Sequence, residues 1–262
     1  MDSAAASLTV VIPCYNEAER LDEAPLLAFL DGCAEASLLF VDDGSTDATA
    51  DRLATIAAAR PARIEVLSLR PNGGKAEAVR RGMLAALERG AGVVGYLDAD
   101  LSTPPREIFR LRAAFDRPGA QADIQAVLGA RVALLGMDIE RSAARHYLGR
   151  VFASVAAAIL QARVYDTQCG AKLFRASAAL RGALATPFLS RWAFDVELLG
   201  RLLTGGEGVP GMPVAAVVEV PLNTWHDVKG SKLSPLAMAR SLVDLGRIGL
   251  DIAARRRRSR AA

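Results

Sequence analysis

The sequence has few aromatic residues, few cysteines and little net charge, and each shortage excludes a class of protein. Aromatic residues make up 5% of the 262 residues, and 32 Lys and Arg stand against 29 Asp and Glu. A nucleic-acid-binding protein would need a basic excess or aromatic platforms for bases, so we expect no nucleic-acid partner. The cysteines, Cys14, Cys33 and Cys169, are widely spaced without a CxxC pair, which excludes a zinc site and a disulfide framework.

Long apolar runs are also missing. The uncharged stretches between Arg150 and Arg163 and between Asp2 and Glu17 are both shorter than the ~20 residues of a membrane span. An acid rather than a base precedes the first apolar run, unlike a signal peptide, so we expect a cytoplasmic protein. Arg255 to Arg258 and Arg260 leave two alternatives for the C-terminus: a frayed, solubilising tail, or a peripheral contact with anionic lipid on the cytoplasmic face of a membrane.

Short apolar runs alternate with longer segments of helical spacing, which predicts an α/β fold. Continuous apolar strands separated by helices are typical of a mostly parallel central sheet with helices on both faces. The strands are expected at 8–15, 37–43, 64–69, 93–100, 126–131 and 213–222, and helices at 46–60, 75–89, 141–162, 193–203 and 235–258; 166–174 is expected to be extended or looped.

One domain is expected over residues 1–232, followed by an amphipathic helix and basic tail over 233–262. The terminal helix carries an apolar stripe at helical spacing, made of Met238, Leu242, Leu245, Ile248 and Ile252. We favour docking of this stripe on its own domain over insertion into a lipid interface.

Polar residues follow four successive predicted strands, where an α/β sheet binds its ligands. They are Asn16 and Glu17, Asp42 and Asp43, Asn72 and Lys75, and Asp98 and Asp100. Two carboxylates suit a hard divalent cation such as Mg²⁺, whose remaining ligands are substrate phosphates and water. Lys75 follows two glycines at a predicted helix start, where it can reach a phosphate, although the segment lacks the complete P-loop pattern.

These motifs together resemble the family 2 glycosyltransferases of GT-A fold. The resemblance rests on VVIPCYNE, VDDGSTD, NGGK and DADLSTPP, and continues through DTQCGAKLF, RWAFDVELL and GSKL. It is strongest to the dolichyl-phosphate β-glucosyltransferase and polyprenyl-phosphate glycosyltransferase branch. It implies a UDP-sugar donor, a polyprenyl phosphate acceptor, and Mg²⁺ or Mn²⁺ as cofactor.

The resemblance also implies residue roles. The nucleotide would be lined by Pro13, Tyr15, Glu17 and Asp43, and the donor would also be contacted by Lys75 and Lys232. The metal would be held by Asp98 and Asp100, and the acceptor phosphate by Arg131 and Arg145. Ser102 stands where mannosyltransferase relatives commonly carry a glutamine, which leaves a third metal contact open.

The class of acceptor decides whether a base is needed. A phosphomonoester is largely ionised at neutral pH, whereas a hydroxyl must lose its proton to a base. Asp195 and Glu197 are the candidates for a base, and they do not face the same way on a helix. We favour Asp195 as the catalytic residue, and a structural role for both acids stays open. Trp192 is expected in the core rather than against a sugar.

The sequence therefore predicts a metal-dependent, inverting hexosyltransferase that moves glucose from UDP-glucose to a polyprenyl or dolichyl phosphate. One alternative is a soluble family 2 enzyme with a sugar or glycan hydroxyl as acceptor. Another, from a different class, is an inactive nucleotide-sugar-binding membrane scaffold. The complete set of Asp43, Lys75, Asp98 and Asp100 disfavours the scaffold.

Overall fold

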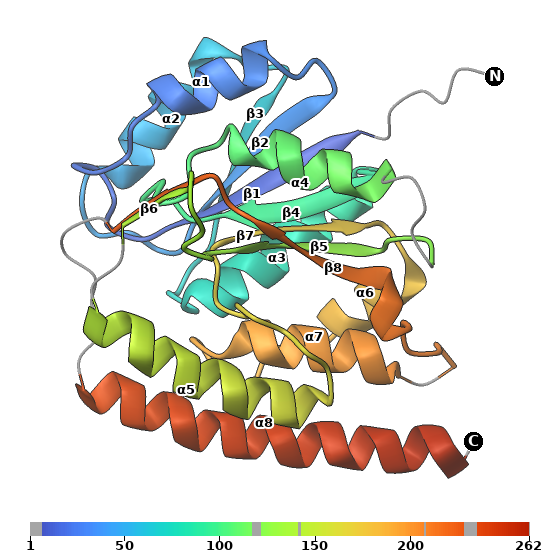
Figure 1. Cartoon of the computed structure of the whole chain (residues 1–262). Coiled ribbons are helices and arrows are strands. Elements are labelled where there is room, and N and C mark those ends of the chain that lie inside the picture. Colours follow the sequence, from blue (N-terminus) through green and yellow to red (C-terminus); the bar gives the residue numbers. More distant parts are fainter. Residues whose placement is uncertain (1–6, 117–121, 141–142, 207, 228–234, 262) are drawn as a thin grey trace.

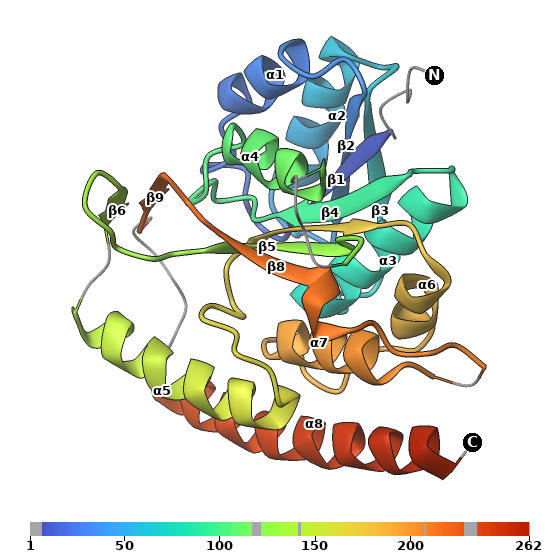
Figure 2. The same ribbon diagram turned by 45° about the vertical axis from the view of Figure 1, so that its right-hand side comes forward.

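A central sheet lies between layers of helices in the computed structural model (Figures 1 and 2). The structure describes residues 7–116, 122–140, 143–206, 208–227 and 235–261. Within these ranges, seven strands pair in the order β3-β2-β1-β4-β7-β5-β8. They are β1 (Leu8–Cys14), β2 (Ala36–Asp42), β3 (Ile64–Ser68), β4 (Val93–Leu97), β5 (Ala126–Ala130), β7 (Ala171–Arg175) and β8 (Val217–Pro221).

The sheet is mostly parallel, as the sequence predicts. β2 pairs in parallel with β1 and β3, β1 with β4, and β5 with β8. β7 runs antiparallel to both β4 and β5, so it alone reverses direction in this sheet. The segment 166–174, expected to be extended or looped, thus contains a loop followed by most of a central strand.

The strands are buried on both faces, which explains their continuous apolar runs. Successive side chains alternate between the faces, so Val11 packs into one core while Val10 and Ile12 pack into the other. The core with Val10 also contains residues of α1 (Ala24–Asp31), α2 (Thr49–Ala59) and α4 (Glu107–Ala113). The core with Val11 contains residues of α3 (Lys75–Glu88), α5 (Ala143–Leu160), α6 (Ala178–Leu184), α7 (Phe194–Thr204) and α8 (Pro235–Ala261).

The terminal helix α8 docks on its own domain. Leu245, Ile248 and Ile252 are fully buried, whereas the side chains of Met238 and Leu242 lie outside the described part of the structure. Gly200 on α7 permits this contact, because a Cβ there would lie 2.2 Å from Ile252 Cδ1. In both views α8 runs beside α5, away from the sheet (Figures 1 and 2). The predicted boundary after residue 232 falls outside the described residues.

Several boundaries differ from those predicted. β4 ends at Leu97 rather than 100, and β8 begins at Val217 because a 3₁₀ turn, Val214–Ala216, precedes it. The short helices α1, α4 and α6 are too brief to show clear periodicity in the sequence. Two short parallel strands, β6 (Asp138–Glu140) and β9 (Thr224–His226), form a separate sheet.

Candidate active site

A cavity of about 390 Å³ opens at the carboxyl ends of β1, β2, β3 and β4. The order of strands reverses here, because β2 and β3 lie on one side of β1 and β4 on the other. Ligands of open α/β sheets bind at such a point. The cavity is lined by Pro13, Cys14, Tyr15, Glu17, Arg20, Asp43, Asn72, Gly74, Lys75, Ala78, Asp98, Ala99, Asp100, Arg191 and Trp192.

Asp43 organises the loop between β3 and α3. Its Oδ1 accepts a hydrogen bond of 2.8 Å from the Gly73 amide, and its Oδ2 accepts one of 2.7 Å from the Gly74 amide. Asn72 Nδ2 also donates to the Asp43 carbonyl at 2.8 Å. Gly74 has φ +88°, a conformation that L side chains rarely adopt. Asp43 lines the cavity as expected, and it also fixes the loop that places Lys75.

Lys75 and Asp98 form an ion pair inside the cavity, with Nζ 2.6 Å from Oδ1. Burial alone would lower the pKa of Lys75, but the negative charges of Asp98, Asp195 and Asp100 outweigh burial and raise this pKa. Gly170 makes room for the Asp98 carboxylate, because a Cβ there would lie 2.2 Å from Oδ2. The GGK loop, the acidic motif after β4 and the loop before β7 therefore meet at one point.

Asp100 is the second acid of the DAD sequence. Its Oδ1 accepts a hydrogen bond of 3.0 Å from the Ser102 amide, and Leu101 between them has φ +52°. Within the described ranges, no three His, Cys, Asp or Glu side chains cluster as a metal site. Asp98 and Asp100 still fit a magnesium or manganese ion, because such ions take one or two carboxylates and complete their shell with phosphates and water.

The segment after β1 forms one wall of the cavity. Arg20 lies 2.7 Å from the Glu17 carboxylate, and the Glu17 amide donates to Thr49 Oγ1 at 2.8 Å. Asn16 has φ +54°, and its Oδ1 accepts a bond of 2.9 Å from the Thr46 amide. These contacts connect the wall to the loop after β2.

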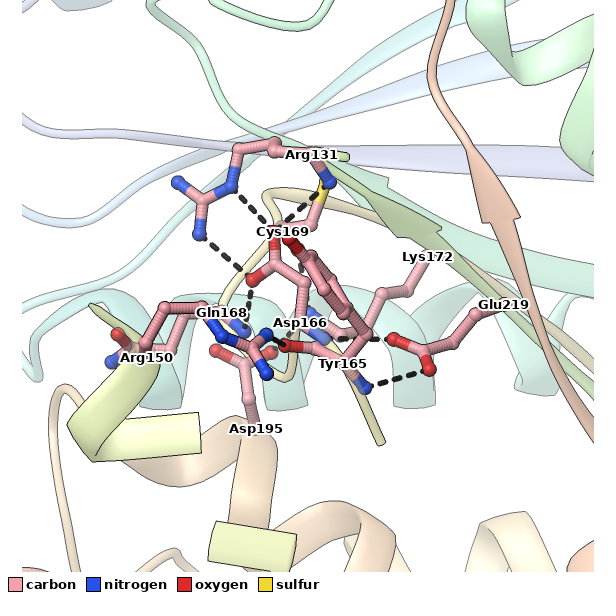
Figure 3. Close-up of polar contacts among 9 residues, drawn as sticks. All are labelled: Arg131, Arg150, Tyr165, Asp166, Gln168, Cys169, Lys172, Asp195 and Glu219. Carbon is pink, nitrogen blue, oxygen red and sulfur yellow. Dashed lines mark hydrogen bonds and ion pairs between the residues drawn. The ribbon is translucent and has the colours of Figure 1, made fainter. Parts of the chain in front are cut away.

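Asp195 lies beneath the cavity rather than among the residues that line it. Its Oδ1 is 2.8 Å from Lys172 Nζ and accepts a hydrogen bond from the Tyr96 hydroxyl. The side chains of Lys172 and Asp195 are 1% and 6% exposed. Lys172 Nζ also donates to the Cys169 carbonyl at 2.6 Å. Figure 3 shows Asp195 reaching from its helix toward Lys172. Its catalytic role stays a prediction.

Glu197, the other candidate base, is fully buried on α7. Its Oε1 lies 2.6 Å from Arg201 Nη2, and its Oε2 accepts a hydrogen bond of 2.8 Å from the Leu189 amide. These contacts hold the segment before α7 against the helix.

Arg131 belongs to a neighbouring polar cluster around the loop before β7. Its Nε and Nη2 donate to the two oxygens of Asp166 at 2.6 and 2.8 Å (Figure 3). Burial alone would raise the pKa of Asp166, but the charge and hydrogen bonds of Arg131 outweigh burial and lower this pKa. The Glu219 carboxylate on β8 accepts hydrogen bonds of 2.7 and 2.8 Å from the amides of Tyr165 and Asp166. Arg131 also lies 5.3 Å from the Trp225 ring centre.

The cavity gathers most of the predicted donor residues, namely Pro13, Tyr15, Glu17, Asp43, Lys75, Asp98 and Asp100. Arg131 lies outside its lining, Arg145 lies on α5 with a side chain outside the described part, and Lys232 lies outside the described residues. The roles assigned to these residues stay predictions.

The expectation for Trp192 is wrong, because its side chain is 48% exposed and lines the cavity instead of the core. Arg20 and Arg191 also line the cavity and were missed. Arg20 belongs to the same loop as Glu17, so its position was a usable signal. Arg191 opens RWAFDVELL, one of the motifs that carry the family resemblance, so its place in that motif was the available signal.

Comparison with known proteins identifies relatives over nearly the whole chain. A dolichyl-phosphate beta-glucosyltransferase of Dictyostelium discoideum is 33% identical, with 90% of this chain and 72% of that protein covered. An enzyme of the same name from Drosophila melanogaster is 34% identical, with 92% and 74% covered. A polyprenol monophosphomannose synthase of Mycolicibacterium smegmatis is 29% identical, with 86% and 80% covered.

Solved structures share the fold. Glucosyl-3-phosphoglycerate synthase of Mycobacterium tuberculosis bound to UDP superposes with a TM-score of 0.67 at 19% identity, covering 94% of this chain and 81% of that one. The same enzyme with Mn²⁺ and UDP-glucose gives a TM-score of 0.67 at 20% identity, covering 94% and 80%. The family model described as Glycosyl transferase family 2 matches residues 9–179. With the strand-end acids meeting in one cavity of a GT-A sheet, the chain is a glycosyltransferase and belongs to glycosyltransferase family 2.

Proposed function

We propose that this enzyme transfers glucose from UDP-glucose to a polyprenyl or dolichyl phosphate, with inversion at the anomeric carbon. The names of the relatives from Dictyostelium, Drosophila and Mycolicibacterium support a lipid phosphate as acceptor. The first two support glucose as the sugar, and the solved structures with UDP-glucose support the donor.

The observation that carries the proposal is the state of the two candidate bases. Asp195 is paired with Lys172 below the cavity, and fully buried Glu197 is paired with Arg201. A general base must lie within hydrogen-bond reach of the proton it takes, and neither carboxylate is among the residues that line the cavity. A phosphate acceptor needs no base, since its second pKa of about 6 leaves it largely ionised at neutral pH. The positions of these two acids outside the cavity lining therefore favour phosphate over a sugar hydroxyl.

The reaction is then a single displacement. An acceptor phosphate oxygen forms a bond to the anomeric carbon while the bond from that carbon to the UDP oxygen breaks, and UDP leaves with the electron pair. Asp98 and Asp100 would hold Mg²⁺ or Mn²⁺, which would neutralise charge on the departing diphosphate. Lys75, fixed by the Asp43 loop, adds a positive charge beside the same acids.

A screen of donors and acceptors tests this function. We expect radiolabel from UDP-glucose to pass into organic solvent when polyprenyl phosphate is present, and to stay in water with the matching polyprenol, which lacks the phosphate. UDP-galactose, UDP-N-acetylglucosamine and GDP-mannose serve as competing donors. Label that stays in water with every donor, even when polyprenyl phosphate is present, would contradict the lipid acceptor and support the hydroxyl alternative.

We also propose that the outer face of α5 and α8 makes a peripheral contact with an anionic membrane. No described helix is both long and apolar enough to cross a bilayer. Val151 and Val155 on α5 and Val243 and Leu250 on α8 are exposed apolar side chains. The two helices run side by side, and on α8 the residues Val243, Leu250 and the exposed Arg257 recur at seven-residue spacing, along one side of the helix. Apolar side chains beside basic ones are typical of interfacial helices.

Liposome flotation tests the contact. Replacing Arg257 and Arg258 with Glu is expected to reduce flotation with vesicles containing phosphatidylserine, because each basic residue contributes about 1 kcal/mol near such a surface. Arg256 is left unchanged, since it donates to the carbonyls of Ile159 and Leu160 and so ties α8 to α5. Arg81→Glu, on α3, is the control for a change of exposed charge. Equal flotation of all the variants would contradict the contact.

A further inference from the structure

The charges that line the cavity are matched, with two exceptions. Arg20 pairs with Glu17, and Lys75 pairs with Asp98. Both oxygens of Asp43 accept backbone amides. Of the charged side chains in this lining, Asp100 has one amide partner, at Ser102, and Arg191 has no ion pair with any described residue. The cavity therefore retains one acid suited to a metal and one cation without an ion-pair partner in the part of the chain that the structure describes.

Arg191 lies over the start of α3. A Cβ built on Gly74 would lie 3.0 Å from Arg191 Cδ and 3.4 Å from its Nε. Its guanidinium thus lies close to the backbone that leads into Lys75, the first residue of α3. A helix amino terminus carries partial positive charge, so an anion at this place would meet Arg191, Lys75 and the helix end together.

The terminal helix holds the segment that carries Arg191. Ser190, fully buried, accepts hydrogen bonds on its Oγ from the amides of Trp192 and Ala193, at 3.2 and 2.9 Å. The same hydroxyl donates to Asp244 Oδ2 on α8 at 2.7 Å. The Asp244 carboxylate therefore orients the Ser190 hydroxyl, and Ser190 in turn fixes the turn on either side of Arg191.

We propose that Arg191 binds a phosphate group in this cavity and that Asp244 is a positioning residue that holds it through Ser190. The phosphate belongs either to the donor diphosphate or to the acceptor, and in the second case the inference rests on the proposed function. Guanidinium groups bind phosphate oxygens through charge-assisted hydrogen bonds, often two at once. The terminal helix thus contributes to the active site without lining it.

Arg191→Ala tests the proposal, with Arg191→Lys as the conservative variant. Calorimetric titration with UDP and Mn²⁺ measures the donor side, and the KM for polyprenyl phosphate measures the acceptor side. We expect Arg191→Ala to weaken one of the two by about tenfold or more, as for the loss of a hydrogen bond to a charged group. Weaker UDP binding identifies the donor diphosphate, and a higher KM with unchanged UDP binding identifies the acceptor.

Arg191→Lys is expected to recover part of the loss, because it keeps the charge but loses the planar fork. The control is Arg81→Ala, which removes an exposed arginine from α3 outside the cavity. UDP binding and acceptor KM both within twofold of the wild type in Arg191→Ala would overturn the proposal. The UDP titration needs no acceptor, so failure of the wild type to use polyprenyl phosphate would reject the proposed function separately.

Asp244→Ala is expected to change the same parameter as Arg191→Ala by a smaller factor, about threefold, while kcat changes little. The side chain in Asp244→Asn can still accept a hydrogen bond from the Ser190 hydroxyl, so this variant is expected to restore the affected parameter to the wild-type value. Asp251→Ala is the matched control, because it removes a carboxylate from the same helix but outside this turn. The variant breaks the ion pair in which Arg255 Nε lies 2.6 Å from Asp251 Oδ2. No change in Asp244→Ala, or an equal change in Asp251→Ala, would overturn the positioning role.

Discussion

Asp100→Ala is expected to reduce sugar transfer about a thousandfold while the protein stays folded. Asp100 follows the end of β4, and its carboxylate has no cation partner among the described residues. Asp43 also lacks a cation partner there, but both of its oxygens accept backbone amides. A catalytic metal contributes several kcal/mol to the neutralisation of a leaving group, and each 1.36 kcal/mol corresponds to a factor of about ten in rate. Initial rates with Mg²⁺ and Mn²⁺ titrated from zero measure the effect.

The control for this variant is Asp31→Ala, which removes a carboxylate that is 59% exposed on α1. It should transfer sugar at the rate of the wild type and require the same metal concentration. Thermal unfolding of both variants checks that the fold is kept. Wild-type rates in Asp100→Ala, unchanged by EDTA, would contradict a metal at this position.

Lys172→Met is expected to lower the free energy of unfolding by about 3–5 kcal/mol, the usual cost of breaking a buried ion pair. The variant leaves the Asp195 carboxylate, 6% exposed, with the Tyr96 hydroxyl but without its cation. It also removes the hydrogen bond from Lys172 Nζ to the Cys169 carbonyl. Urea unfolding followed by circular dichroism measures the loss.

The double variant Lys172→Met, Asp195→Leu removes both charges and is expected to be more stable than Lys172→Met alone. Its stability should still fall short of the wild type, because the Tyr96 hydroxyl loses its acceptor. Arg60→Ala is the comparison, since Arg60 and Asp31 form an exposed pair worth at most about 1 kcal/mol. A loss below 1 kcal/mol in Lys172→Met would show that this buried pair contributes little.

The same double variant separates two roles of Asp195. If Asp195 acts only by neutralising the charge of Lys172, the folded double variant should retain most of the sugar transfer to polyprenyl phosphate. Loss of transfer in a folded protein would instead support the catalytic role predicted for Asp195 from the sequence.

The positions of the cavity acids were predictable because they depend on local pattern and one general rule. Apolar runs locate the strands, and the carboxyl ends of parallel strands meet at one edge of a sheet. Asp43, Lys75 and Asp98 each follow such a run, and all three line the cavity. The terminal helix was predictable for a similar reason, since the stripe containing Leu245 and Ile248 has helical spacing and is buried.

Partnerships between distant residues were not predictable. The sequence presents Asp195 as a free acid on a helix, but the reversed strand β7 brings Lys172 to within 2.8 Å of it. Arg131 likewise presents a free cation, which the loop before β7 pairs with Asp166. In both cases a neighbour from another element decides whether a charge is available to a ligand.

By itself, the sequence determined the α/β class, the succession of strands and the acids that follow them, because periodicity and turn chemistry act over a few residues. Tertiary structure alone decided that Trp192 and Arg191 line the cavity and that Asp244 reaches their turn from the terminal helix. The physical reason is that exposure and charge pairing depend on how helices pack across the sheet, and a local pattern does not encode that packing.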